Sequence, residues 1–113
     1  MSAFSVASTA QASEIDKGVK RVIVVLTGTA SYDTNGSTAA FTSHFTSKVF
    51  GMRVLGVTAH GSDRYKLELI PAASYGLSPT IKVRDAAAGT PMAEASSTAD
   101  LSSHSWTIEV LGT

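Results

Sequence analysis

The side chains best suited to acid–base or metal chemistry in this chain are its three histidines, His44, His60 and His104. Their spacing matches no zinc-binding motif, and no carboxylate stands at an offset that would complete a ligand set. His60 adjoins a Gly-Ser-Asp turn sequence, and His104 begins an alternating segment. We therefore interpret all three as surface or turn residues, and we predict neither a metal site nor a bound cofactor.

The other reactive side chains form no catalytic motif. No serine lies in a Gly-x-Ser-x-Gly sequence, and the glycines form neither a dinucleotide-binding nor a phosphate-binding loop. Asp33, Asn35 and Asp63 are turn formers rather than calcium ligands, because the alternating acidic positions and the terminal Glu of an EF-hand are missing. The sequence therefore predicts a protein that is not an enzyme.

Composition narrows the class of protein further. A chain of 113 residues suits one domain, and the absence of cysteine excludes disulfides and thiolate chemistry. The formal net charge is zero, and the short basic cluster of Lys17, Lys20 and Arg21 lies beside Glu14. Nucleic-acid binding is not expected, because phosphate contacts require a basic excess. The longest apolar run, Val22 to Leu26, is too short to cross a bilayer, and residues 1–12 lack the features of a secretory signal. We expect a soluble protein without a membrane partner.

The elements that must position any site are short strands. In the last one, Trp106, Ile108 and Val110 alternate with Thr107 and Glu109, which is typical of a half-buried strand. Further strands are predicted at 49–59, 65–69 and 81–84, the first of them interrupted by glycines that suggest bulges. The β-branched run 22–26 indicates a strand covered on both faces, by a second sheet or by a neighbouring subunit.

Two connecting segments carry local signals. The Asn35-Gly36 pair predicts a tight turn, because both residues tolerate positive φ. Residues 37–48 contain apolar residues at helical spacing but many Ser and Thr, so we expect a loop with one helical turn. Within it, Phe41 and Phe45 are predicted to close one end of the core rather than to form a ligand site.

Together these signals predict an all-β fold, an antiparallel β-sandwich or a jelly-roll-like small barrel. The single β domain is expected to span 17–113. Residues 1–16 are small and polar, with Phe4, Val6 and Ile15 as isolated apolar residues. This segment is predicted to be a flexible N-terminal arm, either a disordered tail or an arm that orders only on a partner.

The order of motifs resembles a family of small bacteriophage virion proteins. The segments that carry the resemblance are Val22–Thr29, Tyr32–Ser37, Val49–Met52, Tyr65–Leu69, Ile81–Val83, Pro91–Ala95, Asp100–Ser102 and the last strand. Proteins of this family are described as head decoration, cement or minor structural proteins. The chain departs from the pattern in its Ser-rich first 16 residues and in a turn that has one glycine where two are common.

The resemblance implies a non-enzymatic decoration protein on the outer surface of the virion head, made in the host cytoplasm. Its partner would be the major capsid protein, and it would stabilise the shell by bridging capsomers, as a homo-oligomer and most simply a trimer. The alternative is another virion component, a tail or fibre protein that contacts a host surface. A small hydrolase or sugar-binding module would instead need a pocket of convergent polar groups. The candidate contacts with capsid or subunit are Phe4, Val6, Ile15, Tyr32, Asp33, Asn35, Gly36, Pro91 and Met92.

Overall fold

The computed structural model describes residues 3–8, 10–57, 65–85, 93–95 and 99–113. Over these residues the protein is all-β, as the sequence predicts, with one short 3-10 turn at Ala73–Tyr75. The strands are β1 (Ala3–Val6), β2 (Gln11–Asp16), β3 (Val19–Thr27), β4 (Ser37–Ala39), β5 (Val49–Val57), β6 (Tyr65–Ile70), β7 (Thr80–Asp85), β8 (Ala93–Glu94) and β9 (Ser105–Gly112).

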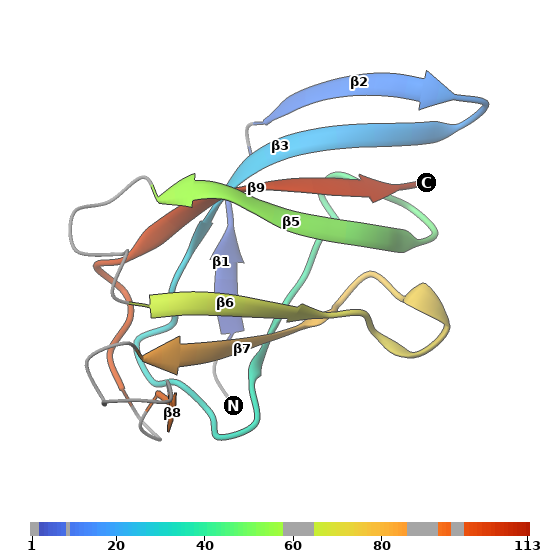
Figure 1. Cartoon of the computed structure of the whole chain (residues 1–113). Helices are drawn as coiled ribbons and strands as arrows, with labels where there is room; N and C mark the ends of the chain where they lie inside the picture. Colours follow the sequence, from blue (N-terminus) through green and yellow to red (C-terminus); the bar gives the residue numbers. More distant parts are fainter. Residues whose placement is uncertain (1–2, 9, 58–64, 86–92, 96–98) are drawn as a thin grey trace.

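These strands form one continuous sheet that almost closes into a barrel (Figure 1). The order is β5-β9-β3-β1-β4-β7-β6, with β2 attached to β3 and β8 attached to β7. The short strand β1 pairs antiparallel with β3 and parallel with β4, so it joins the two halves of the sheet. The described ends of the strand order are β5 and β6, and their facing edges are not paired with each other.

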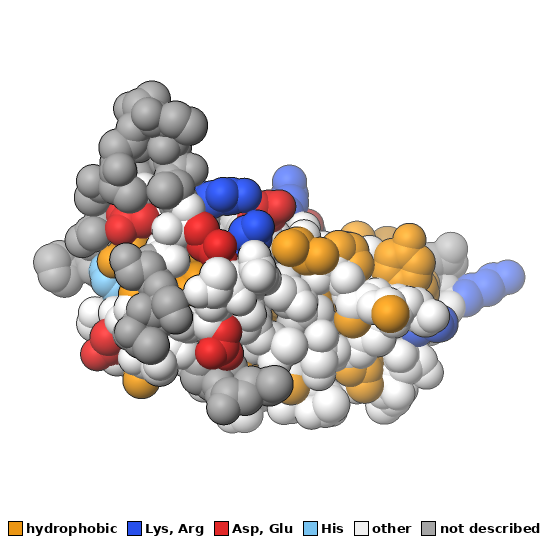
Figure 2. Space-filling model, turned by 90° about the horizontal axis from the view of Figure 1, so that it is seen from below, with side chains coloured by type: hydrophobic (Ala, Val, Ile, Leu, Met, Phe, Trp, Pro, Cys, Tyr) orange, Lys and Arg blue, Asp and Glu red, His pale blue; other side chains and the backbone are white. Residues whose placement is uncertain are grey.

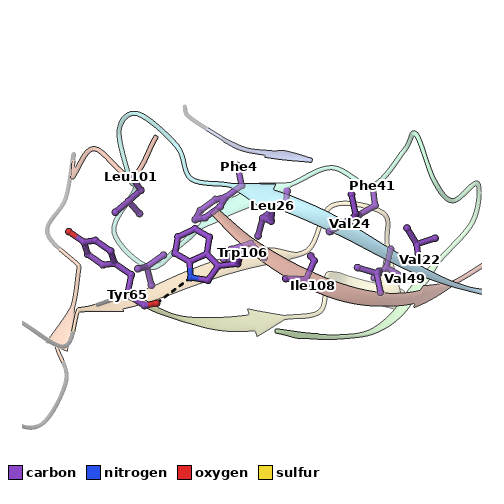
Figure 3. Close-up of a cluster of buried hydrophobic side chains, with 14 of the residues drawn as sticks. Phe4, Val22, Val24, Leu26, Phe41, Val49, Tyr65, Leu101, Trp106 and Ile108 are labelled. Carbon is purple, nitrogen blue, oxygen red and sulfur yellow. Dashed lines mark hydrogen bonds between the residues drawn. The ribbon is translucent and has the colours of Figure 1, made fainter. Parts of the chain in front are cut away.

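The core lies between the two halves of the sheet and is centred on β9 and β3. Trp106, Ile108 and Val110 are buried, as their alternation predicts, and they pack with Val22 and other inward residues of β3 (Figure 3). The indole N–H of Trp106 donates a hydrogen bond to the Tyr65 carbonyl oxygen, with 3.4 Å between the heavy atoms. A buried indole therefore keeps a partner for its one polar atom.

The loop after β4 closes one end of this core, which confirms the prediction for its two phenylalanines. Phe41 and Phe45 are both buried, and the Phe45 N–H donates to the Phe41 carbonyl oxygen in a single helical turn. We refer to this loop, with Phe41 and Phe45, as the plug. Gly112 of β9 lies against the plug. A Cβ on Gly112 would come within 2.2 Å of the Lys48 carbonyl oxygen and 2.8 Å of the Phe45 ring. Close packing of the plug therefore requires glycine at this position.

The strand at 22–26 is covered on one face only within the monomer. Val22, Val24 and Leu26 are buried, whereas Ile23 is half-buried and Val25 is 37% exposed on the outer face. A run of β-branched residues does not separate a strand buried on both faces from one with an apolar outer face, because β-branched side chains favour both positions. No second sheet covers the outer face among the described residues, and cover by a neighbouring subunit stays a prediction.

The predicted flexible arm at residues 1–16 differs from the structure, which forms two strands there. In β1, Ser5 pairs with Thr27 and Val6 with Leu26, and β2 pairs with the first half of β3. The Phe4 side chain is 4% exposed, and its ring centroid lies 6.3 Å from that of Trp106. Isolated apolar residues gain burial here by adding to an existing sheet edge, which local composition does not reveal.

Replacing Phe4 with alanine tests whether β1 belongs to the core. The Phe4→Ala variant is expected to lose about 3–5 kcal/mol of unfolding free energy, because a buried aromatic ring against Trp106 is removed. Ser5→Ala, at the exposed neighbouring position, is expected to change it by less than about 0.5 kcal/mol. Chemical denaturation followed by Trp106 fluorescence measures both. Equal stabilities for the two variants would contradict the packing of β1 in the core and support the flexible arm predicted from the sequence.

Candidate functional site

The structure divides the candidate contact residues into buried and accessible groups. Phe4 and Tyr32 are buried in the core, so their side chains are not at the surface of the monomer. Contact of the candidate residues with a partner stays a prediction. Val6 is partly buried against the core, whereas Ile15 is 56% exposed. Pro91 and Met92 lie outside the described residues. The three remaining candidates, Asp33, Asn35 and Gly36, lie together in one turn.

That turn has the geometry predicted from its Asn-Gly pair. Asn35 and Gly36 both have positive φ, 71° and 114°, and the Gly36 N–H donates to the Asp33 carbonyl oxygen at 2.9 Å. A Cβ on Gly36 would lie 2.4 Å from the Thr80 side chain, so glycine is needed for both conformation and space. The Ser37 hydroxyl accepts the Asp33 N–H at 3.1 Å, which fixes the start of the turn.

Glu94 of β8 clamps the turn to the core. One of its carboxylate oxygens accepts both the Tyr32 hydroxyl and the Asn35 backbone N–H, each at 2.6 Å. The Tyr32 oxygen in turn accepts the backbone N–H of Val83 at 3.0 Å. Burial of the ring, followed by the hydrogen bond to Glu94, raises the pKa of Tyr32. Charge-assisted hydrogen bonds to Glu94 thus hold the backbone of the turn against the core.

Sequence reasoning did not assign a role to Glu94. Its strand, β8, has two residues, which is too short for any periodic signal. The one available signal was its place in the segment Pro91–Ala95, which the family resemblance had singled out. Chemically the Tyr32–Glu94 pair acts as a structural latch, since Oε2 of the carboxylate accepts two donors from the chain itself.

The described histidines occupy separate structural positions. The His44 ring nitrogen Nε2 lies 2.7 Å from the Ala7 carbonyl oxygen, and the His104 ring packs edge-on against Tyr65 at 4.8 Å between centroids. His60 lies outside the described residues. In the part of the chain that the structure describes, no group of three or more His, Asp or Glu side chains is arranged to hold a metal ion.

The basic cluster near the N-terminus is occupied by contacts within the chain. The Lys20 ammonium donates to the His44 carbonyl oxygen at 2.6 Å and lies 5.5 Å from the centroid of the Phe45 ring. Arg21 and Arg53 flank Glu109 on the outer face of β3, β9 and β5, at 3.2 and 2.9 Å. Opposite charges on neighbouring strands of one sheet face pair in this way and contribute modestly to stability.

A cleft opens between the free edges of β5 and β6. Its volume is about 370 Å³, and its lining is Val54, Leu55, Gly56, Tyr65, Lys66, Leu67 and Trp106. Strand β5 contains two register shifts, at Val49/Gly51 and at Val54/Gly56, which confirm the bulges predicted from its glycines. Val54 and Leu55 are 38% and 44% exposed. We refer to this cleft and its two strand edges as the seam.

An exposed aromatic pair joins the start of β5 to the β6–β7 connection. The rings of Phe50 and Tyr75 lie 6.1 Å apart, and both are more than two-fifths exposed, at 42% and 50%. Ser74 and Tyr75 both have positive φ, 55° and 57°, which is costly for residues with side chains. The Lys48 ammonium donates to the Ser74 carbonyl oxygen at 3.0 Å. In the space-filling view, hydrophobic side chains are exposed beside a cluster of acidic and basic ones (Figure 2).

Comparisons with protein-family models, with curated protein sequences and with solved structures find no match for this chain. None of the described residues forms a helix that is long and apolar enough to span a membrane. Three accessible features are candidate contact surfaces: the turn at residues 33–36, the seam and the Phe50–Tyr75 pair.

Removing the Tyr32 hydroxyl tests the latch. Tyr32→Phe is expected to cost about 1–3 kcal/mol, because the Val83 N–H loses its acceptor inside the core and Glu94 loses a donor. Tyr75→Phe, at an exposed ring, is the matched control and is expected to be nearly neutral. Denaturant unfolding at neutral pH measures both. A Tyr32→Phe variant as stable as the parent protein would show that the latch contributes nothing to the free energy of unfolding.

The parent protein and Tyr32→Phe are also expected to differ in how their free energy of unfolding depends on pH. Because the folded protein raises the pKa of Tyr32, the unfolded chain loses the phenol proton first. The stabilisation from this proton is complete below about pH 10 and declines as the pH rises above it. We expect the free energy of unfolding to fall more steeply above about pH 10 in the parent protein than in Tyr32→Phe. Equal slopes would contradict this.

Proposed function

We propose that this protein is a non-enzymatic bacteriophage head decoration protein, which binds the outer surface of the capsid shell and stabilises it by bridging capsomers. One observation carries the proposal: large apolar side chains are exposed on the strands and connections of a small, well-packed sheet. They are Ile15, Val25, Phe50, Val54, Leu55, Ile70 and Tyr75. Two neighbouring pairs stand out among them, the Phe50 and Tyr75 rings and the Val54 and Leu55 side chains at one cleft. Adjacent exposed apolar side chains are typical of surfaces that contact other proteins.

Such a protein stabilises a shell by mass action. A ligand that binds the assembled shell and not the free subunits makes dissociation less favourable, and the effect grows with the ratio of free ligand to its dissociation constant. Bridging of neighbouring capsomers multiplies this effect over many copies. This role requires contact surfaces that keep their shape, and it needs no reaction centre.

The turn at residues 33–36 is the proposed contact with the major capsid protein. Its Thr34 and Asn35 side chains are exposed, while Glu94 and Ser37 hold its backbone. A surface that is ordered before binding loses little conformational entropy when it docks. The latch on Tyr32 thus supports binding indirectly, although Tyr32 itself is buried.

Self-association is part of the proposal, with a trimer favoured at positions of local threefold symmetry on the shell. The described strand order ends at β5 and β6, and β2 pairs on one side only. Exposed strand edges invite pairing with other chains, and oligomers commonly cover them.

A second role is favoured by one specific observation. The exposed Phe50–Tyr75 pair, held by a backbone with two positive φ angles, is the kind of aromatic cluster expected on a tail or fibre protein that contacts a host surface. Copy number separates the two roles. A number near that of the capsid protein supports decoration, and a few copies per particle supports the tail or fibre role.

The decoration proposal is tested with shells that lack the protein. Added protein is expected to bind them saturably and to raise the temperature or osmotic shock at which they break. Thr34→Lys is expected to weaken binding by about tenfold or more, because it places a bulky charge in the proposed contact. Thr42→Lys, exposed in the loop before β5, is the matched control and should bind normally.

Two results would contradict the proposal. One is the failure of the purified parent protein to bind shells. The other is equal resistance of shells with and without it to heat and osmotic shock.

A further inference from the structure

We infer that the outer face of β3, β9 and β5 docks a segment of the shell protein that carries one carboxylate between two apolar side chains. The inference rests on the proposed function, because a protein that bridges capsomers needs a second contact besides the turn at residues 33–36. The three strands run side by side in the upper part of Figure 1. Their outward residues that carry the argument are Arg21, Ile23, Val25, Arg53, Glu109 and Leu111, and we refer to them as the outer face.

The centre of the outer face carries two guanidinium groups on one carboxylate. Arg21 and Arg53 donate to different oxygens of Glu109, at 3.2 and 2.9 Å. The Glu109 side chain is 13% exposed, whereas those of Arg21 and Arg53 are 45% and 69% exposed. Two positive charges and one negative charge leave a net charge of +1 in this group. The excess positive charge therefore lies at the surface.

Both arginines keep hydrogen-bond donors for a further acceptor. Arg53 binds Glu109 through Nε alone, and its two terminal amino groups have no acceptor among the described residues. Arg21 binds through one terminal nitrogen only, within the same part of the chain. A guanidinium group presents parallel N–H donors that match the two oxygens of a carboxylate. A carboxylate from a partner therefore satisfies both the free donors and the excess charge.

Apolar hollows lie on both sides of the charged group. One, of about 410 Å³, is lined by Ile23 and Val25 and reaches Gln11 of β2. The other, of about 230 Å³, is lined by Leu111 and lies over β9 and β5. The hollows are about two strands apart, which is at least about 10 Å. In an extended segment, side chains i and i+4 lie on one face about 13 Å apart, with side chain i+2 between them. An apolar-x-acidic-x-apolar segment therefore fits both hollows and the arginines.

The same charge argues against a second copy of this chain as the occupant. Two outer faces packed against each other would bring together two groups that each carry a net charge of +1. Like charges that meet across an interface are unfavourable. Charge complementarity instead selects an acidic segment of the shell protein to cover Val25 and its neighbours.

A peptide probe tests the site without shells. The probe is acetyl-Leu-Ser-Glu-Ser-Leu-amide, and a second peptide has glutamine in place of the glutamate. Titration followed by amide NMR is expected to shift signals of β3, β9 and β5, with at least about threefold tighter binding of the glutamate peptide. Equal affinities, shifts confined to other strands, or no binding up to about 10 mM would overturn the inference. Shifts of the same signals on dilution of the parent protein alone would assign the face to a second copy instead.

Arg53→Gln identifies the charge that recognises the carboxylate. This variant is expected to bind the two peptides equally, because its ion-pair group has lost the excess positive charge. Arg84→Gln is the matched control, since Arg84 is also exposed and pairs with one glutamate, Glu68, on the other half of the sheet. It should keep the threefold preference. Persistence of the preference in Arg53→Gln, or its loss in Arg84→Gln, would contradict the assigned site.

Glu109→Gln separates ligand binding from a purely structural role. Without its own carboxylate, the group holds two uncompensated guanidinium charges, so the glutamate peptide is expected to bind at least about threefold more tightly than to the parent protein. A residue that only holds the strands together would weaken binding when it is replaced. Circular dichroism checks that the variant folds. Weaker binding of the peptide to folded Glu109→Gln would overturn the inference.

Shells that lack the protein test the identity of the partner. Arg53→Gln is expected to bind them about tenfold more weakly than the parent protein, and the difference should shrink at high salt, whereas Arg84→Gln should bind normally. Normal shell binding by Arg53→Gln would overturn the assignment to the shell protein. A parent protein that binds shells but shows no peptide preference overturns this inference alone. A parent protein that prefers the glutamate peptide but does not bind shells supports the acid-binding face and overturns decoration.

Discussion

The long antiparallel pairing of β3 with β9 is the interaction on which the rest of this structure depends. It runs from Lys20 opposite Gly112 to Thr27 opposite Ser105, and its inward residues, among them Trp106, form the centre of the core. The other strands extend from this pair: β5 pairs with the far side of β9, β1 and β2 pair with the far side of β3, and β4, β7 and β6 follow beyond β1. Because its partners are far apart in the sequence, the fold forms through non-local contacts, which carry a large loop-closure cost.

Local sequence patterns predicted those parts of the fold whose causes are themselves local. The alternation around Trp106, the Asn35-Gly36 turn and the burial of Phe41 and Phe45 each follow from neighbouring residues. The strands β1 and β2 were missed because their stability comes from an edge supplied by β3, which lies outside any local window. Glu94 was missed for a similar reason, since its role depends on a tyrosine and a turn that tertiary pairing brings to it.

Because the sheet does not close completely, its candidate contact features include strand edges at the surface. A closed barrel would satisfy the edges of β5 and β6, whereas here they face each other across an apolar cleft. Natural sheets commonly protect such edges with bulges and charges, and both are present: the β5 bulges, and the Glu68–Arg84 pair at 3.3 Å beside the edge of β6. Exposed Val54 and Leu55 work against that protection. Partial protection of this kind discourages random pairing of the edges and leaves an apolar surface at the cleft.

The two proposed contacts with the shell depend on different halves of the sheet, so each can be altered without the other. The turn at residues 33–36 is held by Tyr32, Glu94 and Val83, which belong to the β4–β7–β8 half. The outer face is held by the pairing of β9 with β3 on one side and with β5 on the other. The halves meet through β1, whose Phe4 packs on Trp106. Damage at Phe4 should therefore weaken both contacts, whereas changes at Thr34 or Arg53 should each weaken one, since distant sites without shared partners act independently.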